Sequence, residues 1–295
     1  SRYHMRWFLD HLPEDGSVSV HRFDMDLMGL SIAGPNSRKT LQKLVDEDIS
    51  NEEFRFMDIR EMDVNGAPCI VNRVTFSGDL GYEIWMEPVY QRRVYDGLKE
   101  AGNEFNIIDF GMRALLSMRL EKNFPTWFGE LRPIYGPYDA SMERFIKLSK
   151  NDFIGREQAA KEHADGPSMR RVSFVIEADT ADIMADEPIW AKVGDKSYDM
   201  IEKPHGYGAK RFDVDGNEVT PTAPDVDGDW RVVGWITSGG YGHYVEASLG
   251  QGYVPAELAD REDEDFFEIE ILGVRRKARI NVEPLFDPTG ERMRS

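Results

Sequence analysis

The sequence of 295 residues contains one cysteine, Cys69, which lies in the apolar stretch 67–71. A single cysteine excludes an internal disulfide and any metal site built from several thiolates, and it is typical of a protein from a reducing compartment. A small apolar residue in such a stretch belongs to a core more often than it acts as a nucleophile. We therefore expect Cys69 to be buried and unreactive.

The chain also lacks any run of the roughly 18 apolar residues that a membrane-spanning helix needs, and residues 1–10 lack the apolar core of a signal peptide. Basic residues are few, because 36 Lys and Arg stand against 54 Asp and Glu, for a formal net charge of −18. A surface this acidic repels phosphate backbones. We expect no nucleic-acid or membrane partner, and a cytoplasmic location with the mitochondrial matrix as the alternative.

Familiar catalytic signatures are missing as well. There is no Gly-x-Gly-x-x-Gly after a strand, no Walker loop and no His-Glu-x-x-His. The six histidines are scattered without the spacing of a metal site, so we expect no metal. His205 and His243 lie in glycine-rich loops, where a ligand contact and a solvated side chain are both open interpretations.

The first half of the chain mixes helical and strand-like patterns. Asn65-Gly66 separates two strand-like segments and predicts a tight hairpin. A strand is expected at 82–86, further strands at 18–22 and 142–148, and a helix capped by Asp109. These patterns predict a mixed sheet-and-helix domain.

After residue 166 the sequence pattern changes to short strand-like segments separated by turns rich in Gly, Asp and Pro. This pattern predicts a small β-barrel, with the polar segment 197–229 as an excursion from it. The fold class is therefore α+β, with a sheet-and-helix domain over 1–165 and a C-terminal β-barrel over 166–295.

Several weak motifs follow one another in a fixed order, and they span nearly the whole chain: 76–84, 111–121, 150–157, 234–241, 252–255 and 273–284. In this order they resemble the aminomethyltransferase family, which includes the T-protein of the glycine cleavage system. Segments 33–44 and 118–127, with Glu283-Pro284-Leu285, resemble most closely the tetrahydrofolate-binding C-terminal part of dimethylglycine and sarcosine dehydrogenases.

The resemblance implies a folate site. Its glutamate corresponds to Glu83, whose two carboxylate oxygens suit the N–H groups of a pterin edge. Its arginine corresponds to Arg113, which we expect on a shielded helix face, paired with folate or with Glu83. The alternative is that Glu83 and Arg113 form an ordinary salt bridge. Tyr82, the strand neighbour of Glu83, should point the other way, into the core.

Other cofactor-binding residues follow from the same resemblance. Tyr241, Trp127 and Glu130 are expected in the folate site, the last two in a loop where the family binds its substrate. Glu121 reads as a helix-surface residue or a structural ion-pair partner. Asp79 forms either a turn or part of the site.

The sequence departs from the family pattern in three places. Asp79 ends the motif 77–79 where the family has a glutamate, and 286–290 contain no tyrosine to match a C-terminal ligand contact. The family's catalytic aspartate belongs to an N-terminal segment that has no counterpart in these 295 residues. The catalytic residues are therefore unknown, and we expect a missing N-terminal transferase segment, on another chain or upstream.

The function implied is that of the tetrahydrofolate-dependent one-carbon transferase part of an FAD-linked amine dehydrogenase. A partner domain or subunit would hold FAD and oxidise a methylated amine, since this chain has no dinucleotide fingerprint. This chain would convert the formaldehyde or iminium product into methylenetetrahydrofolate. The alternatives are a non-redox demethylase of a sulfonium or methoxy substrate and a non-catalytic folate-binding scaffold.

Overall fold

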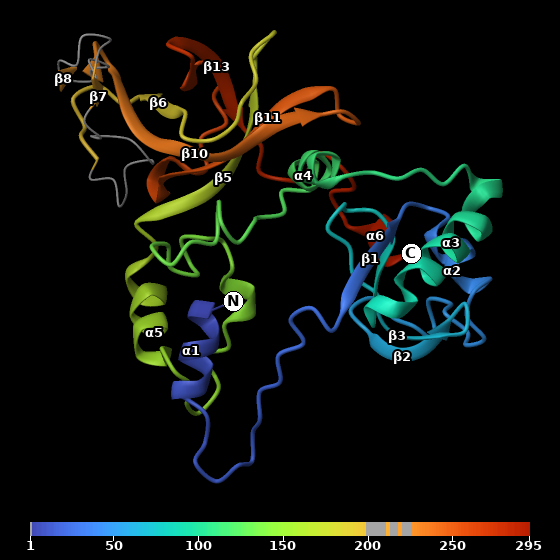
Figure 1. Ribbon diagram of the computed structural model, residues 1–295. Helices are drawn as coiled ribbons and strands as arrows, with labels where there is room; N and C mark the ends of the chain where they lie inside the picture. Colours follow the sequence, from blue (N-terminus) through green and yellow to red (C-terminus); the bar gives the residue numbers. More distant parts are fainter. Residues whose placement is uncertain (1, 199–210, 213–217, 220–225) are drawn as a thin grey trace. The chain divides into compact units, whose positions relative to one another are not determined.

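The computed structural model describes residues 2–198, 211–212, 218–219 and 226–295, and these form two compact units (Figure 1). Unit 1 comprises residues 1–75, 79–108 and 293–295, and unit 2 comprises 76–78 and 109–292. The units divide near residue 108, since the helix Met112–Glu121 contacts the barrel strands. The domain boundary expected at 165 stays a prediction. His205 and most of the segment 197–229 lie outside the described residues.

Unit 1 is built on a four-stranded antiparallel sheet of order β1-β4-β3-β2. Its elements are α1 (Arg2–Asp10), β1 (Met28–Ala33), α2 (Ser37–Gln42), β2 (Ile59–Val64), β3 (Ala67–Asn72), β4 (Gly81–Met86), η1 (Pro88–Tyr90), α3 (Gln91–Gly102) and η2 (Asn103–Phe105). The predicted hairpin at Asn65-Gly66 is confirmed. Both residues have positive φ, 53° and 68°, as the two central positions of a type I′ turn require.

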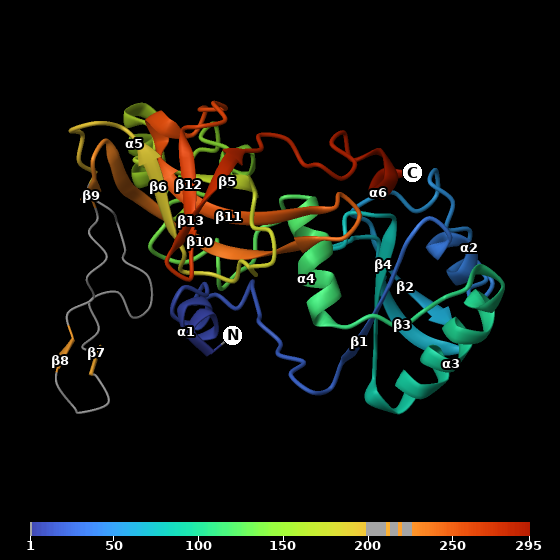
Figure 2. The ribbon, with the colours of Figure 1, turned by 90° about the horizontal axis from the view of Figure 1, so that it is seen from above.

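Alternation along β4 gives the sheet a covered and an open face. Tyr82, Ile84 and Met86 are buried and pack with residues of α2 and α3, which lie on the same side of the sheet (Figure 2). The prediction that Tyr82 belongs to the core is confirmed. Glu83 and Trp85 therefore point to the opposite face, which we call the open face.

Cys69 lies in this core, as predicted, with 5% of its surface exposed. Burial raises the pKa of its thiol to about 11. Because the thiolate is the reactive form, we expect Cys69 to resist a disulfide reagent at pH 8 while unit 1 is folded, and to react at once in denaturant. Fast stoichiometric labelling of the native chain would show that this part of the core opens readily.

Unit 2 contains the barrel. Its strands are β5 (Met169–Ile176), β6 (Pro188–Lys192), β9 (Val226–Asp227), β10 (Trp230–Gly242), β11 (Ala247–Pro255), β12 (Phe267–Ile271) and β13 (Val274–Ile280). The order β11-β5-β13-β12-β6-β10 closes through the pairing of β10 with β11, which gives six strands, with β9 added at β10. Figure 2 labels these strands. The predicted α+β class with a C-terminal barrel is confirmed.

The remaining elements of the chain are short. They are α4 (Met112–Glu121), η3 (Glu143–Phe145), α5 (Arg156–Asp165), η4 (Ala256–Leu258), α6 (Glu291–Arg294) and the pair β7 (Arg211–Phe212) and β8 (Glu218–Val219). No helix among the described residues has the length and apolarity needed to cross a bilayer.

Three predicted elements differ from the structure. No strand forms at 18–22, where Val18 and Val20 are exposed and no neighbouring strand pairs with them. Residues 142–148 contain the 3-10 helix η3 in place of a strand. The helix predicted from Asp109 begins at Met112, with Gly111 as its N-cap residue.

Glycines in β10 allow the barrel to close. A Cβ atom on Gly234 would lie 1.8 Å from the main-chain oxygen of Tyr253, which no side chain can tolerate. The pairing of β10 with β11 shifts register between Ile236 and Ser238, which is the signature of a β-bulge. The bulged residue is Thr237.

Candidate functional site

A buried ion pair joins α4 to the loop that follows it. Nη1 of Arg119 lies 3.3 Å from Oε2 of Glu130, and the two side chains are 3% and 0% exposed. Thr126 donates to the same oxygen through its main-chain N at 2.7 Å and its Oγ1 at 2.9 Å. The other oxygen, Oε1, accepts from Oγ1 of Thr237 at 2.6 Å and from Oγ of Ser238.

These donors decide the charge of Glu130. Burial raises the pKa of Glu130, but the Arg119 charge and the Ser238, Thr237 and Thr126 hydrogen bonds outweigh it, so the pKa lies below its ordinary value. Glu130 is thus a carboxylate with both oxygens bound by protein donors. It braces the turn 126–131 against the bulge of β10. Its predicted contact with folate stays a prediction.

Two more charges at the end of α4 are buried. Oε1 of Glu121 accepts from the main-chain N of Tyr244 at 2.7 Å and of Val245 at 3.2 Å, which holds the tip of the β10–β11 hairpin. Glu121 is therefore a buried structural residue and does not lie on the helix surface. Nζ of Lys122 lies 3.0 Å from Oδ2 of Asp287, and both side chains are buried.

The Lys122–Asp287 pair predicts a pH dependence. Burial raises the pKa of Asp287, but the hydrogen bonds from Lys122 and the main-chain N of Arg292 and Glu291 outweigh it and lower the pKa. A lowered native pKa contributes stability that is complete above the unfolded value of about 4 and is lost as pH falls through the native value. We expect Asp287→Asn to be less stable than wild type at pH 6, with the difference shrinking below pH 4. Urea unfolding at several pH values measures it, and a constant difference would contradict this assignment.

Glu83 differs from Glu121 and Glu130 because no protein donor binds its carboxylate within the described residues. It is half-buried on the open face of the sheet, opposite Ser31 on β1 and Asn72 on β3. Within the described residues it forms no side-chain hydrogen bond and no ion pair. Two residues along β4, the ring of Trp85 lies over Gly29, where an added Cβ would be 2.9 Å from the ring. The open face thus presents a carboxylate and an indole from the same strand.

Arg113 is also uncommitted to a protein partner in the described part of the chain. It lies in the first turn of α4 and is exposed, so the expectation of a shielded side chain is wrong. The reason is that α4 begins two residues later than predicted, which leaves Arg113 at the helix end. Glu83 belongs to unit 1 and Arg113 to unit 2, and their pairing stays a prediction.

The two predicted aromatic residues are accessible. Trp127 is 76% exposed, on the turn that Glu130 braces. Tyr241 lies on β10 with its ring edge-on to that of His243, and its main-chain oxygen accepts from Oγ of Ser117 on α4. Exposed aromatic faces at rigid main-chain positions are suited to stacking on a planar ligand. The hydrogen-bond network around Glu130 was not predicted from the sequence. Its hydroxyl donors, Thr126, Thr237 and Ser238, are the residues that could have indicated it.

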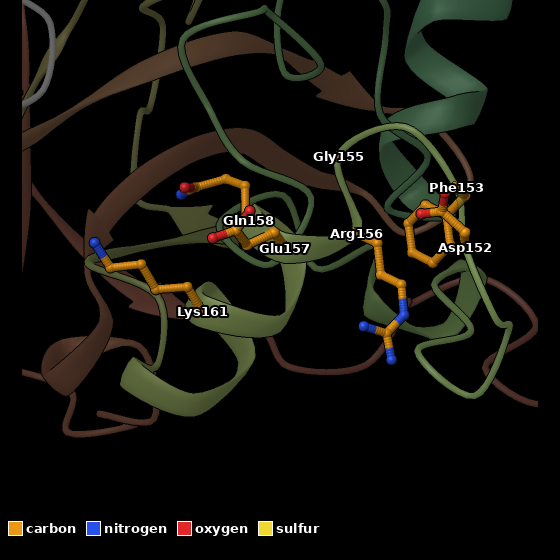
Figure 3. A pocket seen from close by; sticks show the side chains of 7 residues that line it. All are labelled: Asp152, Phe153, Gly155, Arg156, Glu157, Gln158 and Lys161. Carbon is orange, nitrogen blue, oxygen red and sulfur yellow. The ribbon is translucent and has the colours of Figure 1, made fainter.

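A surface hollow lies at the N-terminal half of α5 (Figure 3). Arg156 is engaged there, because its Nε donates to the main-chain oxygen of Lys150 and its Nη2 to that of Leu148, both at 3.1 Å. The side chains of Lys161 and Gln158 extend away from Arg156 and do not converge on one point (Figure 3). We assign no ligand to this hollow. Among the described residues, no group of three or more His, Cys, Asp or Glu side chains could hold a metal ion.

Comparison with known families accounts for both parts of the chain. Residues 1–150 match the GCVT N-terminal domain, and residues 170–287 match the glycine cleavage T-protein C-terminal barrel domain. The chain belongs to the glycine cleavage T-protein family. Folate-dependent one-carbon transfer is the chemistry of this family, whose members include dimethylglycine dehydrogenase and sarcosine dehydrogenase.

The similar proteins include dehydrogenases and an aminomethyltransferase. Human mitochondrial dimethylglycine dehydrogenase is 31% identical over 293 residues, which cover 98% of this chain but 29% of that protein. Human mitochondrial sarcosine dehydrogenase is 27% identical over 91% of this chain and 26% of that protein. The chain thus spans under a third of the length of these relatives. The structure of glycine cleavage system aminomethyltransferase T from Bartonella henselae has the same fold, with a TM-score of 0.64 at 20% identity, over 89% of this chain and 60% of that one.

Proposed function

We propose that this chain binds tetrahydrofolate and forms the one-carbon-transferring part of a methylated-amine dehydrogenase of the dimethylglycine or sarcosine type. The observation that carries the proposal is the state of Glu83. The carboxylates of Glu121 and Glu130 accept hydrogen bonds from protein donors. Glu83 is half-buried on the open face and, within the described residues, forms no side-chain hydrogen bond or ion pair. A carboxylate held in this way is prepared for a ligand with adjacent N–H donors.

The residues present fit a reduced pterin. The two oxygens of Glu83 can accept from neighbouring ring N–H groups, and Trp85 adds a flat apolar surface two residues away on the same face. Arg113 is free to pair with a folate carboxylate. Bound tetrahydrofolate would supply the amines that accept a one-carbon unit. The chain's own contribution would be to orient those amines and to exclude water.

FAD belongs, in this proposal, to a companion dehydrogenase region. The chain covers 29% of human dimethylglycine dehydrogenase, so most of that protein has no counterpart in these residues. The companion would oxidise the methylated amine, and the chain would capture the product. The family's catalytic aspartate would come from the transferase segment that has no counterpart here.

Titration with tetrahydrofolate tests the proposal. We expect the chain together with its companion segment to bind tetrahydrofolate saturably, and the isolated chain to bind it more weakly, because the transferase segment that has no counterpart in these residues would supply part of the site. Isothermal calorimetry on both samples gives the two dissociation constants. Equal constants would contradict a divided site, and no saturable binding in either sample would overturn the function.

A further inference from the structure

One face of α4 lies against the hairpin that β10 and β11 form (Figure 2). Arg113, Ser117 and Glu121 are spaced four residues apart and therefore share one face of the helix. Oγ of Ser117 donates to the main-chain oxygen of Tyr241 on β10. Oε1 of Glu121 accepts from two main-chain N–H groups at the hairpin tip. The face that carries Arg113 is therefore the face that contacts the hairpin.

Burial decreases along this face toward the start of the helix. Glu121 is 4% exposed, Ser117 is half-buried and Arg113 is exposed. The C-terminal end of α4 is thus anchored on the barrel, and its first turn is the least buried part. Of the three side chains, Ser117 contacts the hairpin nearest to Arg113. Its hydrogen bond therefore limits how far the turn that carries Arg113 can move relative to β10.

The strand that faces α4 allows the helix to approach closely. Tyr241 is flanked by Gly240 and Gly242, so its ring is the only side chain over three positions. A Cβ atom on Gly242 would lie 3.0 Å from Oε1 of Glu121, an oxygen that its two hydrogen bonds hold in place. A larger residue at 242 would therefore push the helix away from the strand. The main chain at Tyr241 is thus fixed to α4 on both sides of the residue.

The ring of Tyr241 is accessible although its main chain is fixed. It is 45% exposed, and its centroid lies 5.2 Å from that of His243. A ring held in this way can stack on a planar group. A guanidinium one helical turn from Ser117 can pair with an anion. Together they suit one ligand in which an aromatic ring is joined to a carboxylate, as in folate.

We propose that Ser117 is a positioning residue for Arg113 and Tyr241. Its hydrogen bond sets the spacing between the guanidinium on α4 and the ring on β10, so that both contact the same tetrahydrofolate molecule. Ser117 itself does not contact the ligand. The inference rests on the proposed function, to which it adds the residue that sets this spacing. Because Ser117 affects only the relative placement of the two side chains, its removal matters only while both are present.

A double-mutant cycle tests this role, with tetrahydrofolate calorimetry on the chain together with its companion segment. We expect Ser117→Ala to weaken binding by roughly fivefold or more, the equivalent of one lost hydrogen bond. Ser117→Thr, which keeps the hydroxyl group, should bind within about twofold of wild type. In a Tyr241→Leu background, Ser117→Ala should change the dissociation constant by less than about twofold. The main-chain oxygen at 241 remains there, so the loss of stability in urea should be the same with and without the ring.

Ser117→Ala should fold, because alanine is a better helix former than serine. Ser168→Ala, at an exposed position outside α4, is the control and should bind as the wild type does. Equal binding by wild type and Ser117→Ala would overturn the inference alone. So would an equal loss of affinity with and without the Tyr241 ring. Absence of saturable binding to the wild type would instead overturn the proposed function, and the inference with it.

Discussion

Replacing Arg119 with methionine should lower the free energy of unfolding by about 3–5 kcal/mol, the usual cost of leaving one partner of a buried ion pair alone. Glu130 has no exposed surface and would keep only neutral donors. Without Arg119 the pKa of Glu130 should rise, because burial is its largest influence and opposes ionisation. The variant should also lose the fixed turn that carries Trp127.

Urea unfolding measures this effect, with Arg92→Met as the matched control. Arg92 forms an exposed i,i+4 pair with Asp96, so its replacement should change the free energy of unfolding by roughly 0.5 kcal/mol or less. If Arg119→Met and Arg92→Met unfold at the same urea concentration, the Glu130 brace does not stabilise unit 2.

Replacing Glu83 with glutamine should weaken tetrahydrofolate binding by about 1–3 kcal/mol, as expected for loss of a charge-assisted hydrogen bond. The change corresponds to roughly 5- to 150-fold in the dissociation constant. Thermal stability should stay unchanged, because the side chains have the same size and Glu83 has no ion-pair partner among the described residues. Calorimetry on the chain with its companion segment measures the affinity.

Glu100→Gln is the matched control, since Glu100 is exposed on α3, which packs on the covered face of the sheet. It should bind tetrahydrofolate as the wild type does. A Glu83→Gln variant that binds normally but melts at lower temperature would make Glu83 a structural residue. Arg113→Lys should weaken binding nearly as much as Arg113→Ala, because an ammonium cannot reproduce the planar fork of a guanidinium.

Local chemistry predicted a large part of this fold. Asn65-Gly66 specifies a hairpin because both residues tolerate positive φ, and the period of two along β4 separates Tyr82 from Glu83. The short strand-like segments after residue 166 correctly predicted the barrel. In each case the signal lies within a few residues of the feature that it specifies.

The functions of the charged side chains could not be predicted in this way. Glu130 meets Thr237, which is 107 residues away, and Glu121 meets Tyr244, 123 residues away. Whether a carboxylate accepts its hydrogen bonds from the protein or stays available to a ligand depends on such distant donors, and no local sequence pattern predicts them. The same holds for 18–22, a segment with strand-like composition that has no neighbouring strand to complete its hydrogen bonds.

The most direct test follows the one-carbon unit itself in the chain assembled with its companion dehydrogenase region. Flavin reduction by dimethylglycine or sarcosine and the formation of methylenetetrahydrofolate are measured separately, in wild type and in Glu83→Gln. We expect equal flavin reduction in both, with methylenetetrahydrofolate as the wild-type product and released formaldehyde as the main product of the variant. Formaldehyde release from the wild type that tetrahydrofolate does not diminish would show that this chain does not capture the one-carbon unit.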